Sequence, residues 1–163
     1  MMVDRGNAAV PYMERTRRYY RALGYERDYV WAHHSETPFA PLEKPLAQCT
    51  VGLITTAGPP DLSNRDESGR RHVWSGKTAN PPATFDTDVA WDKEATHTDD
   101  RESFLPIDAM QRLVDTGEVG ALAARFHGAP TEYSHRKTRE HDAPELLSRL
   151  RDDGVDIAIL CAL

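Results

Sequence analysis

The sequence predicts an α/β fold in which helices cover both faces of a mostly parallel sheet. Strand-like apolar runs alternate with amphipathic helical segments along residues 49–163. The last run, residues 155–163, is apolar on both of its alternating faces, which is typical of an interior strand in a helix-covered parallel sheet. These observations favour the three-layer arrangement of flavodoxin-like and Rossmann-like domains, and we expect a single domain over residues 1–163.

The N-terminal third is expected to contain one helix, one extended segment and one buried strand. Residues 11–23 have a helical pattern with aromatic side chains on one side, and Gly24 would end the helix. Prolines and aromatic residues in the segment 25–47 favour an extended chain. Residues 49–56 form the next buried strand. The segment 61–86 that follows is polar and long, which predicts a functional or mobile loop with one short strand at 72–75.

The second half is expected to contain a strand at 88–92 and then two helix–strand pairs. The first helix begins at Pro106, and a strand over residues 119–126 follows it. The second helix begins after Asp142, which is expected to cap it, and the final strand at 155–163 follows. Parallel strands joined through helices account for this alternation.

The final strand is predicted to end at the edge of the sheet where folds of this class have their active sites. In folds of this class, ligands bind in loops at the carboxyl ends of strands, and a helix follows each loop. We therefore expect the sheet to be incomplete at its C-terminus and the 163 residues to be the front part of a longer protein. Exposed apolar side chains at this end would favour self-association.

Composition excludes several classes of function. The formal net charge is −6 and basic residues form no stripe, which argues against a nucleic-acid partner. No apolar stretch approaches a membrane span, and the N-terminus lacks a signal-peptide core. Two cysteines far apart in sequence do not make a disulfide framework. We therefore expect a cytoplasmic protein.

Three blocks of sequence resemble the glycine/sarcosine/betaine reductase selenoprotein B family. They are residues 91–108 (WDKEATHTDDRESFLPID), residues 117–134 with the run Arg-Phe-His-Gly, and residues 150–160 with the run Asp-Gly-Val-Asp. The resemblance begins at Pro11 and covers nearly the whole chain. The branch it is most similar to is the selenocysteine-bearing subunit of D-proline reductase.

The resemblance implies a selenocysteine or cysteine immediately after Leu163, followed by a cysteine-containing loop and a helix. It further implies reductive cleavage of a carbon–nitrogen bond next to a carboxylate, in D-proline or a glycine derivative. A partner subunit with a pyruvoyl group would activate the amine, the selenolate would take the carbon skeleton, and a nearby thiol would release it. The 163 residues alone would hold no cofactor and would be inactive.

Two other classes of function remain open. A flavodoxin-like nucleotide or flavin binder has only the predicted sheet to support it, because the sequence contains no glycine-rich phosphate loop. A non-catalytic assembly subunit could dock the pyruvoyl partner through the aromatic and proline-rich residues 25–45.

Candidate catalytic residues lie near the expected nucleophile or at the ends of loops and strands. Two residues separate Cys161 from the expected nucleophile, and Cys161 is either a small buried hydrophobe or a redox thiol. His127 at the end of a strand and His97 in a charged loop are either proton donors or surface residues. No histidine spacing predicts a metal site.

Candidate substrate-binding residues are donors to a carboxylate. Thr55, Thr56 and Gly58 could offer hydroxyl and backbone N–H groups, although the same residues make an ordinary turn. Arg125 could pair with a substrate carboxylate or lie solvated at an edge. Because parallel strands end at one edge of a sheet, we expect this turn, His127 and residues 161–163 to converge there.

Overall fold

The computed structural model describes residues 11–28, 30, 32–86, 98–131 and 134–163. The chain divides into two compact units, Met1–Pro38 and Phe39–Leu163, and each is described by itself. The predicted strand at 88–92 and the candidate His97 lie outside the described residues. Within the described ranges, no helix has the length and apolar character needed to cross a bilayer.

The first unit contains helix α1 (Tyr12–Ala22), as the sequence predicts. Beyond its end Gly24 adopts a φ of +88°, a left-handed conformation that glycine tolerates best. Glu14 accepts hydrogen bonds from Arg17 and Arg18 on the helix surface. None of the helix residues is buried. On its aromatic side, the ring of Tyr20 meets those of Tyr19 and Tyr25 edge-on.

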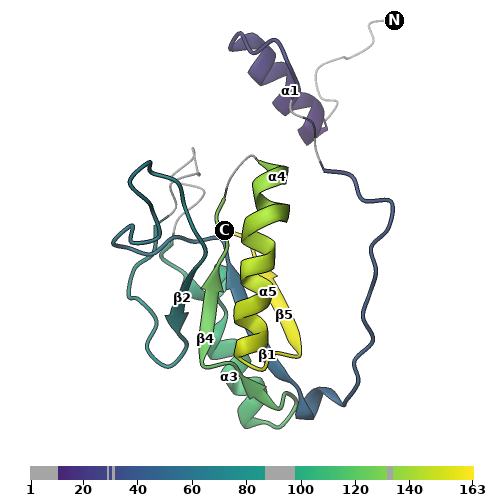
Figure 1. The fold of residues 1–163 in the computed structure, drawn as a ribbon, viewed down its shortest axis with the longest axis vertical. Helices are drawn as coiled ribbons and strands as arrows, with labels where there is room; N and C mark the ends of the chain where they lie inside the picture. Colours follow the sequence, from purple (N-terminus) through teal and green to yellow (C-terminus); the bar gives the residue numbers. More distant parts are fainter. Residues whose placement is uncertain (1–10, 29, 31, 87–97, 132–133) are drawn as a thin grey trace, which may run out of the picture. The chain divides into compact units, whose positions relative to one another are not determined.

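The second unit is broadly α/β, with an open, mixed sheet of five strands accompanied by helices (Figure 1). Its strands are β1 (Thr50–Thr55), β2 (Trp74–Lys77), β3 (Ala121–Leu122), β4 (Arg125–Gly128) and β5 (Ile157–Cys161). Strand β1 pairs in parallel with β3, β4 and β5. Strand β2 pairs with β4 in the antiparallel direction. The short strand predicted at 72–75 therefore exists but begins two residues later.

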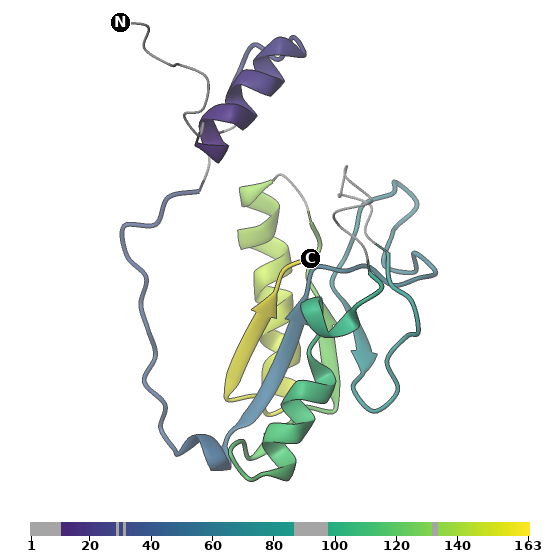
Figure 2. The same ribbon diagram turned by 180° about the vertical axis from the view of Figure 1, so that it is seen from behind.

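Helices pack on two sides of this sheet (Figure 2). One core joins α2 (Arg101–Phe104) and α3 (Ile107–Asp115) to the sheet through Leu53, Phe104 and Phe126. A smaller core joins α5 (Ala143–Asp152) to the sheet through Ile54, Val73, Leu146 and Leu150. Leu53 and Ile54 are neighbours in β1 and lie in different cores, as the alternation of a strand requires.

The strand predicted at 119–126 is replaced by two short strands, β3 and β4, and β4 continues to Gly128. Between them the carbonyls of Ala123 and Ala124 accept hydrogen bonds from Thr78, so the interruption leaves these groups paired. His127 therefore lies within a strand and not after its end. Strands β1 and β2 both pair with β4 at His127 and Gly128, so β4 extends beyond the apolar run of the sequence.

The segment before α5 is helical further upstream than predicted. The hydroxyl of Ser134 accepts a hydrogen bond from the Lys137 amide and starts α4 (His135–Lys137), which continues through the π-helical turn η2 (Thr138–Asp142) into α5. Asp142 has helical dihedral angles and makes no capping bond, so the prediction that it caps the helix is wrong. Pro144 carries no N–H, which accounts for a locally altered hydrogen-bond pattern at this junction.

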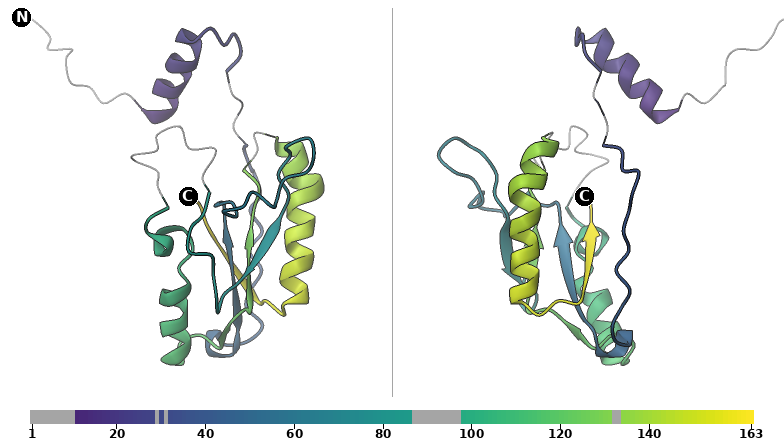
Figure 3. Two further views of the ribbon diagram at one scale, coloured as in Figure 1. Left: turned by 90° about the vertical axis from the view of Figure 1, so that its left-hand side faces the viewer. Right: turned by 45° about the vertical axis from the view of Figure 1, so that its right-hand side comes forward.

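Strand β5 differs from the predicted interior strand. Among the described residues it pairs with β1 alone, and Figure 3 shows it beside β1 at the outside of the sheet. Ile157 and Ile159 pack against the larger core, whereas Leu160 on the alternate side is 57% exposed. Both faces of β5 carry apolar side chains, as predicted, but only the face with Ile157 and Ile159 is covered.

The described part of the block 91–108 holds α2 against α3. Both carboxylate oxygens of Glu102 accept backbone N–H bonds, from Asp108 at 3.2 Å and Ala109 at 3.0 Å. Arg101 forms an ion pair with Asp108 at 2.7 Å. Burial raises the pKa of Glu102, but these N–H bonds and Arg101 outweigh burial and leave it lowered. These residues therefore act structurally by satisfying the free amides at the start of α3.

Candidate functional site at the carboxyl ends of the strands

The carboxyl ends of β1, β4 and β5 meet at one edge of the sheet. Thr55 is aligned with Gly128 on one side and with Cys161 on the other. One residue further on, Thr56 Oγ1 accepts a hydrogen bond of 2.9 Å from the Leu163 amide. The backbone convergence expected from parallel strands is confirmed.

The turn after β1 uses most of its polar groups internally. Thr55 is fully buried, and its hydroxyl oxygen accepts the Ala57 amide at 3.2 Å. Gly58 exchanges two backbone hydrogen bonds with Asp86, so its N–H is not open to a ligand in this conformation. The Thr56 hydroxyl accepts from Leu163 and keeps its own proton to donate. Of the three donors predicted in this turn, Thr56 is therefore the one best able to donate a hydrogen bond to a ligand.

A small pocket of about 10 Å³ lies beside this turn, with room for about one water. Its lining comes from the turn after β1, the loop after β4 and the segment 61–86: Thr56, Ala57, Gly58, Asn64, Arg65, Arg71, Asp86, Ala129, Pro130 and Thr131. Arg71 Nη1 donates to the Thr131 carbonyl at 2.6 Å. Arg65 lies 3.6 Å from the Asp86 carboxylate. The lining thus contains two guanidinium groups and one carboxylate.

Sequence reasoning missed Arg65 and Arg71, although a turn signal was present. The two residues form an antiparallel bridge, and between them Asp66 accepts hydrogen bonds from the amides of Ser68 and Arg70. Gly69 adopts a φ of +78° in this turn. Hydrogen bonds, first from the Ser68 hydroxyl and then from His72, strongly lower the pKa of Asp66. An aspartate followed three residues later by glycine is a turn signal that could have placed both arginines together.

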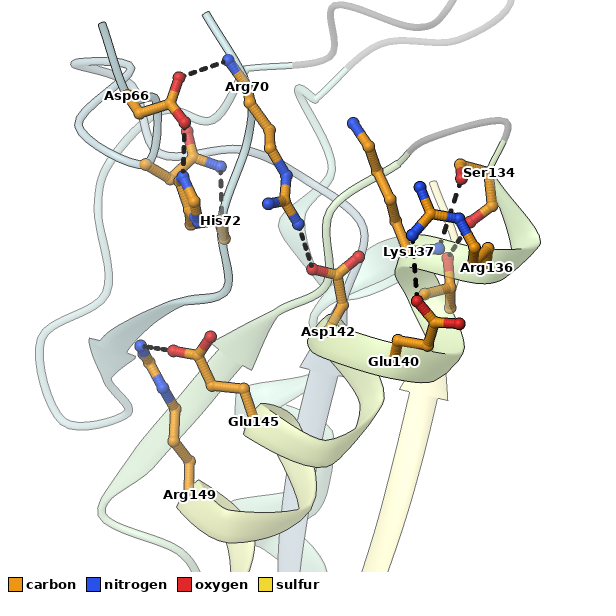
Figure 4. A network of polar contacts seen from close by, with 12 residues as sticks. Asp66, Arg70, His72, Ser134, Arg136, Lys137, Glu140, Asp142, Glu145 and Arg149 are labelled. Carbon is orange, nitrogen blue, oxygen red and sulfur yellow. Dashed lines mark hydrogen bonds and ion pairs between the residues drawn. The ribbon is translucent and has the colours of Figure 1, made fainter. Parts of the chain in front are cut away.

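Figure 4 shows how this turn meets the helical segment that follows β4. The Arg70 guanidinium lies 3.7 Å from the carboxylate of Asp142, which is 5% exposed. On the other side of Asp142, Ser134 caps the start of the same helical segment. The ion pair ties the arginine-bearing turn to a rigid element and so fixes one wall of the pocket.

His127 is fully buried in a chain of polar contacts beneath α5. Its Nδ1 lies 2.8 Å from Ser75 Oγ, and its Nε2 lies 3.0 Å from Asp153 Oδ2. Arg149 donates to Ser75 Oγ at 2.7 Å, so the Ser75 proton is directed to Nδ1 and the ring carries its own proton on Nε2. Both ring nitrogens are occupied within the fold. The geometry gives His127 a positioning role between β2 and the end of α5.

Arg125 also has a partner within the fold. Its Nε and Nη2 donate to the Asp153 carboxylate at 2.9 and 2.7 Å. Nε also lies 3.2 Å from the second carboxylate oxygen. Of the two expectations for Arg125, a substrate carboxylate or a solvated edge, neither describes this ion pair with Asp153. Burial raises the pKa of Asp153, but the bonds and charge of Arg125, with His127, outweigh it and leave that pKa lowered.

The buried His127 predicts a loss of stability in mild acid. Burial lowers its pKa from the ordinary 6.5, and Asp153 offsets this only in part. The unfolded chain therefore binds the proton first, so the contribution of neutral His127 is present above pH 6.5 and is lost as the pH falls below it. We expect His127→Gln to flatten the decline in melting temperature between about pH 7.5 and 5.5.

His141→Gln is the matched control, because His141 is an exposed histidine in η2. It should leave the decline unchanged. An equal decline in the wild-type and His127→Gln proteins would contradict the assignment.

The two cysteines differ in their surroundings. Cys161 is partly buried, and burial raises the pKa of its thiol, which keeps it protonated near neutral pH. This favours the small-hydrophobe interpretation of Cys161 over the redox one. Cys49 is fully buried, and its Sγ contacts the carbonyl of Pro45 at 3.4 Å. Among the described residues, no group of three or more His, Cys, Asp or Glu side chains has a metal-binding arrangement.

The fold and the site define an α/β protein with a small polar pocket at the carboxyl ends of its parallel strands. No protein-family model, no curated protein and no solved structure matches this chain. Its function is therefore argued from its own residues and from the resemblance described above.

Proposed function

We propose that this chain belongs to a subunit of a selenol- or thiol-dependent reductase. As the resemblance implies, the enzyme would cleave the carbon–nitrogen bond of a small amine-carboxylate such as D-proline or a glycine derivative. The observation that carries the proposal is the 2.9 Å hydrogen bond from the Leu163 amide to Thr56 Oγ1. This hydrogen bond holds Leu163, the residue after which the resemblance places the nucleophile, beside the turn that lines the pocket.

The connections between strands support a site at this edge. After β1 the chain passes through β2, and then through α2 and α3 in the larger core, to reach β3. From β4 it passes through α5 in the smaller core to β5. Its direction across the sheet reverses at β1, which has β4 on one side and β5 on the other. In open α/β sheets, ligands bind at the carboxyl ends of strands where the order reverses. We propose on this basis a three-layer, flavodoxin- or Rossmann-like arrangement, with antiparallel β2 added at one edge.

Groups outside this chain would supply the reactive chemistry. When present, a pyruvoyl group on a partner subunit would activate the substrate amine, and a selenol or thiol after Leu163 would supply the nucleophile. The residues of this chain would orient the substrate. The Thr56 hydroxyl can donate to it, and the Thr131 carbonyl holds Arg71 in the pocket wall. Cys161, held as a protonated thiol, would not compete as a nucleophile.

Exposed apolar side chains at the start of the second unit favour docking of the pyruvoyl subunit as an additional role. Phe39 is 92% exposed, Leu42 52% and Leu46 44%. Phe39 and Leu42 lie in the proline-rich segment 25–45 that is expected to dock the partner, and Leu46 follows it directly. Apolar surface of this kind is typical of protein–protein contact sites.

The gene provides the first test of the proposal. We expect the codon after that of Leu163 to encode cysteine, or to be UGA, the codon that selenocysteine shares with stop. We further expect the frame to continue into a cysteine-containing loop and a helix. Sequencing the gene downstream checks both expectations. A UAA or UAG codon at that position, or a continuing frame without such a loop, would contradict the proposal.

A further inference from the structure

We propose that His127 is a proton-sensitive lock that holds strand β2 and the segment 61–86 against the rest of the sheet. The neutral ring keeps the lock closed. Protonation of the ring in mild acid increases a minor population in which β2 has left β4 while β1, β3 and β5 stay paired. This inference is independent of the proposed function.

The hydrogen bonds of the ring are the first argument. Nδ1 accepts from Ser75, whose oxygen accepts from Arg149 at 2.7 Å, and Nε2 donates to Asp153. A second proton on Nδ1 would meet the Ser75 hydroxyl, which could accept it only by giving up the hydrogen bond of its own proton. Because His127 is fully buried, water does not replace this partner while β2 is in place. The closed arrangement therefore fits the neutral ring and not the charged one.

The charges that face the ring are the second argument. Arg125 on β4 and Arg149 on α5 are positive, and Asp153 at the end of α5 is negative. Asp153 favours the charged ring, but it also holds the guanidinium of Arg125. Burial, together with the two arginines, outweighs Asp153 and lowers the pKa of His127. The charged ring is therefore more stable in an open state, where water reaches it.

The other charged groups on the elements around β2 do not favour opening in acid. Glu145 is bound to Arg149, and Lys77 on β2 is exposed and in register with Arg125. His72 lies just before β2, with its Nε2 3.1 Å from the Asp66 carboxylate. Protonation of His72 would strengthen that ion pair and hold the segment 61–86 together. An opening of β2 in mild acid is therefore assigned to His127.

The position of β2 in the sheet is the third argument. Among the described residues it pairs with β4 alone and lies at one end of the sheet. Strands of this kind can open while the rest of a domain stays folded. Val73 is nevertheless buried in the smaller core, and the Trp74 indole donates to the Ala57 carbonyl at 3.1 Å. The open population is therefore small, and opening would free the part of the pocket wall that the segment 61–86 supplies.

Amide hydrogen exchange of the 163-residue chain, followed by NMR at several pH values, tests the lock. The reporter is the Thr78 amide, which donates to the Ala124 carbonyl directly after β2. The reference is the Ala121 amide, which donates to the Cys49 carbonyl where β3 meets β1. Opening constants are the observed exchange rates divided by the rates of an unstructured chain at the same pH.

Thr78 should open at least about tenfold more often than Ala121 at each pH, because β2 opens without the rest of the sheet. Its opening constant should rise severalfold between pH 7.5 and 5.5. One proton sets an upper limit of about tenfold, since the open chain binds it with the ordinary pKa of 6.5. Equal opening constants at the two amides would show that β2 opens only with global unfolding and would overturn the lock. An opening constant of Thr78 that does not change with pH would also overturn it.

His127→Gln is the variant that tests the residue itself. Glutamine offers an acceptor to Ser75 and a donor to Asp153 but takes up no proton, so the rise at Thr78 should disappear. His141→Gln is the matched control, because His141 is exposed in η2, and it should keep the full rise. A rise in His127→Gln as large as in the wild-type chain would refute the assignment.

The wild-type ring signals decide the matter if His127→Gln is unfolded. In the closed state His127 should titrate below its ordinary pKa of 6.5. Titration at or above 6.5 in the folded chain would show that the closed arrangement accepts the charged ring, and the lock would be refuted.

Discussion

Replacing Phe126 with alanine should lower the free energy of unfolding by about 3–5 kcal/mol. Phe126 is fully buried in the larger core, and its ring meets Trp74 edge-on with the centroids 5.3 Å apart. The ring also lies against Gly76 of β2, where a Cβ would overlap it. Truncation would therefore leave a cavity between the sheet and its neighbours. A domain stable by about 5–15 kcal/mol would lose a large share of that stability.

The chain contains a matched control for this substitution. Phe39 belongs to the same unit and is 92% exposed, so Phe39→Ala should change stability by no more than about 0.5 kcal/mol. Urea denaturation followed by far-UV circular dichroism measures both variants. Equal losses in the two variants, or a loss below about 1 kcal/mol in Phe126→Ala, would contradict the packing described for this core.

The parts of the fold that local patterns specify could be predicted from the sequence. The run 49–56 has the apolar character of a buried strand, and β1 occupies Thr50–Thr55. Gly117 and Gly154 adopt φ values of +78° and +66° just beyond the ends of α3 and α5, and glycine at such a position is a local signal that a helix ends. These elements are determined within a few residues of the chain, so short-range reasoning was sufficient.

The errors arise where distant residues decide the structure. Strand β4 runs two residues beyond the predicted end because β1 and β2 both pair with it at His127 and Gly128. Asp142 looks like a helix cap, but its carboxylate is buried beside Arg70. Neither partner is visible in the local pattern of the segment it changes.

The position of the candidate site and its residues Thr56 and Gly58 could be predicted from the sequence, but its two arginines could not. Parallel strands place their carboxyl ends together, which is why the ends of β1, β4 and β5 could be expected to converge. The partner of Arg125 is Asp153, which lies 28 residues further along the chain, and no periodicity connects them. Arg65 and Arg71 lie in a loop without regular spacing. Their meeting depends on a turn and on the Thr131 carbonyl.

The largest functional effect is expected when the nucleophile is blocked in the complete protein. If the proposed function is right, the native protein, isolated with its pyruvoyl partner, reductively opens D-proline or cleaves a glycine derivative. In the balanced reaction, two thiol groups of a dithiol become a disulfide as the carbon–nitrogen bond is replaced by C–H and N–H bonds. Alkylating the selenol or thiol with iodoacetate should abolish turnover, because the alkylated group can no longer attack.

Dithiol-dependent reduction by the native assembly tests most directly whether this chain belongs to a selenol- or thiol-dependent reductase. Product is quantified by mass spectrometry with D-proline, sarcosine, betaine and glycine, before and after alkylation. We expect product from at least one of these substrates and its loss after alkylation under reducing conditions. Absence of product from all four substrates, or turnover that alkylation leaves unchanged, would contradict the assignment of this chain to a selenol- or thiol-dependent reductase.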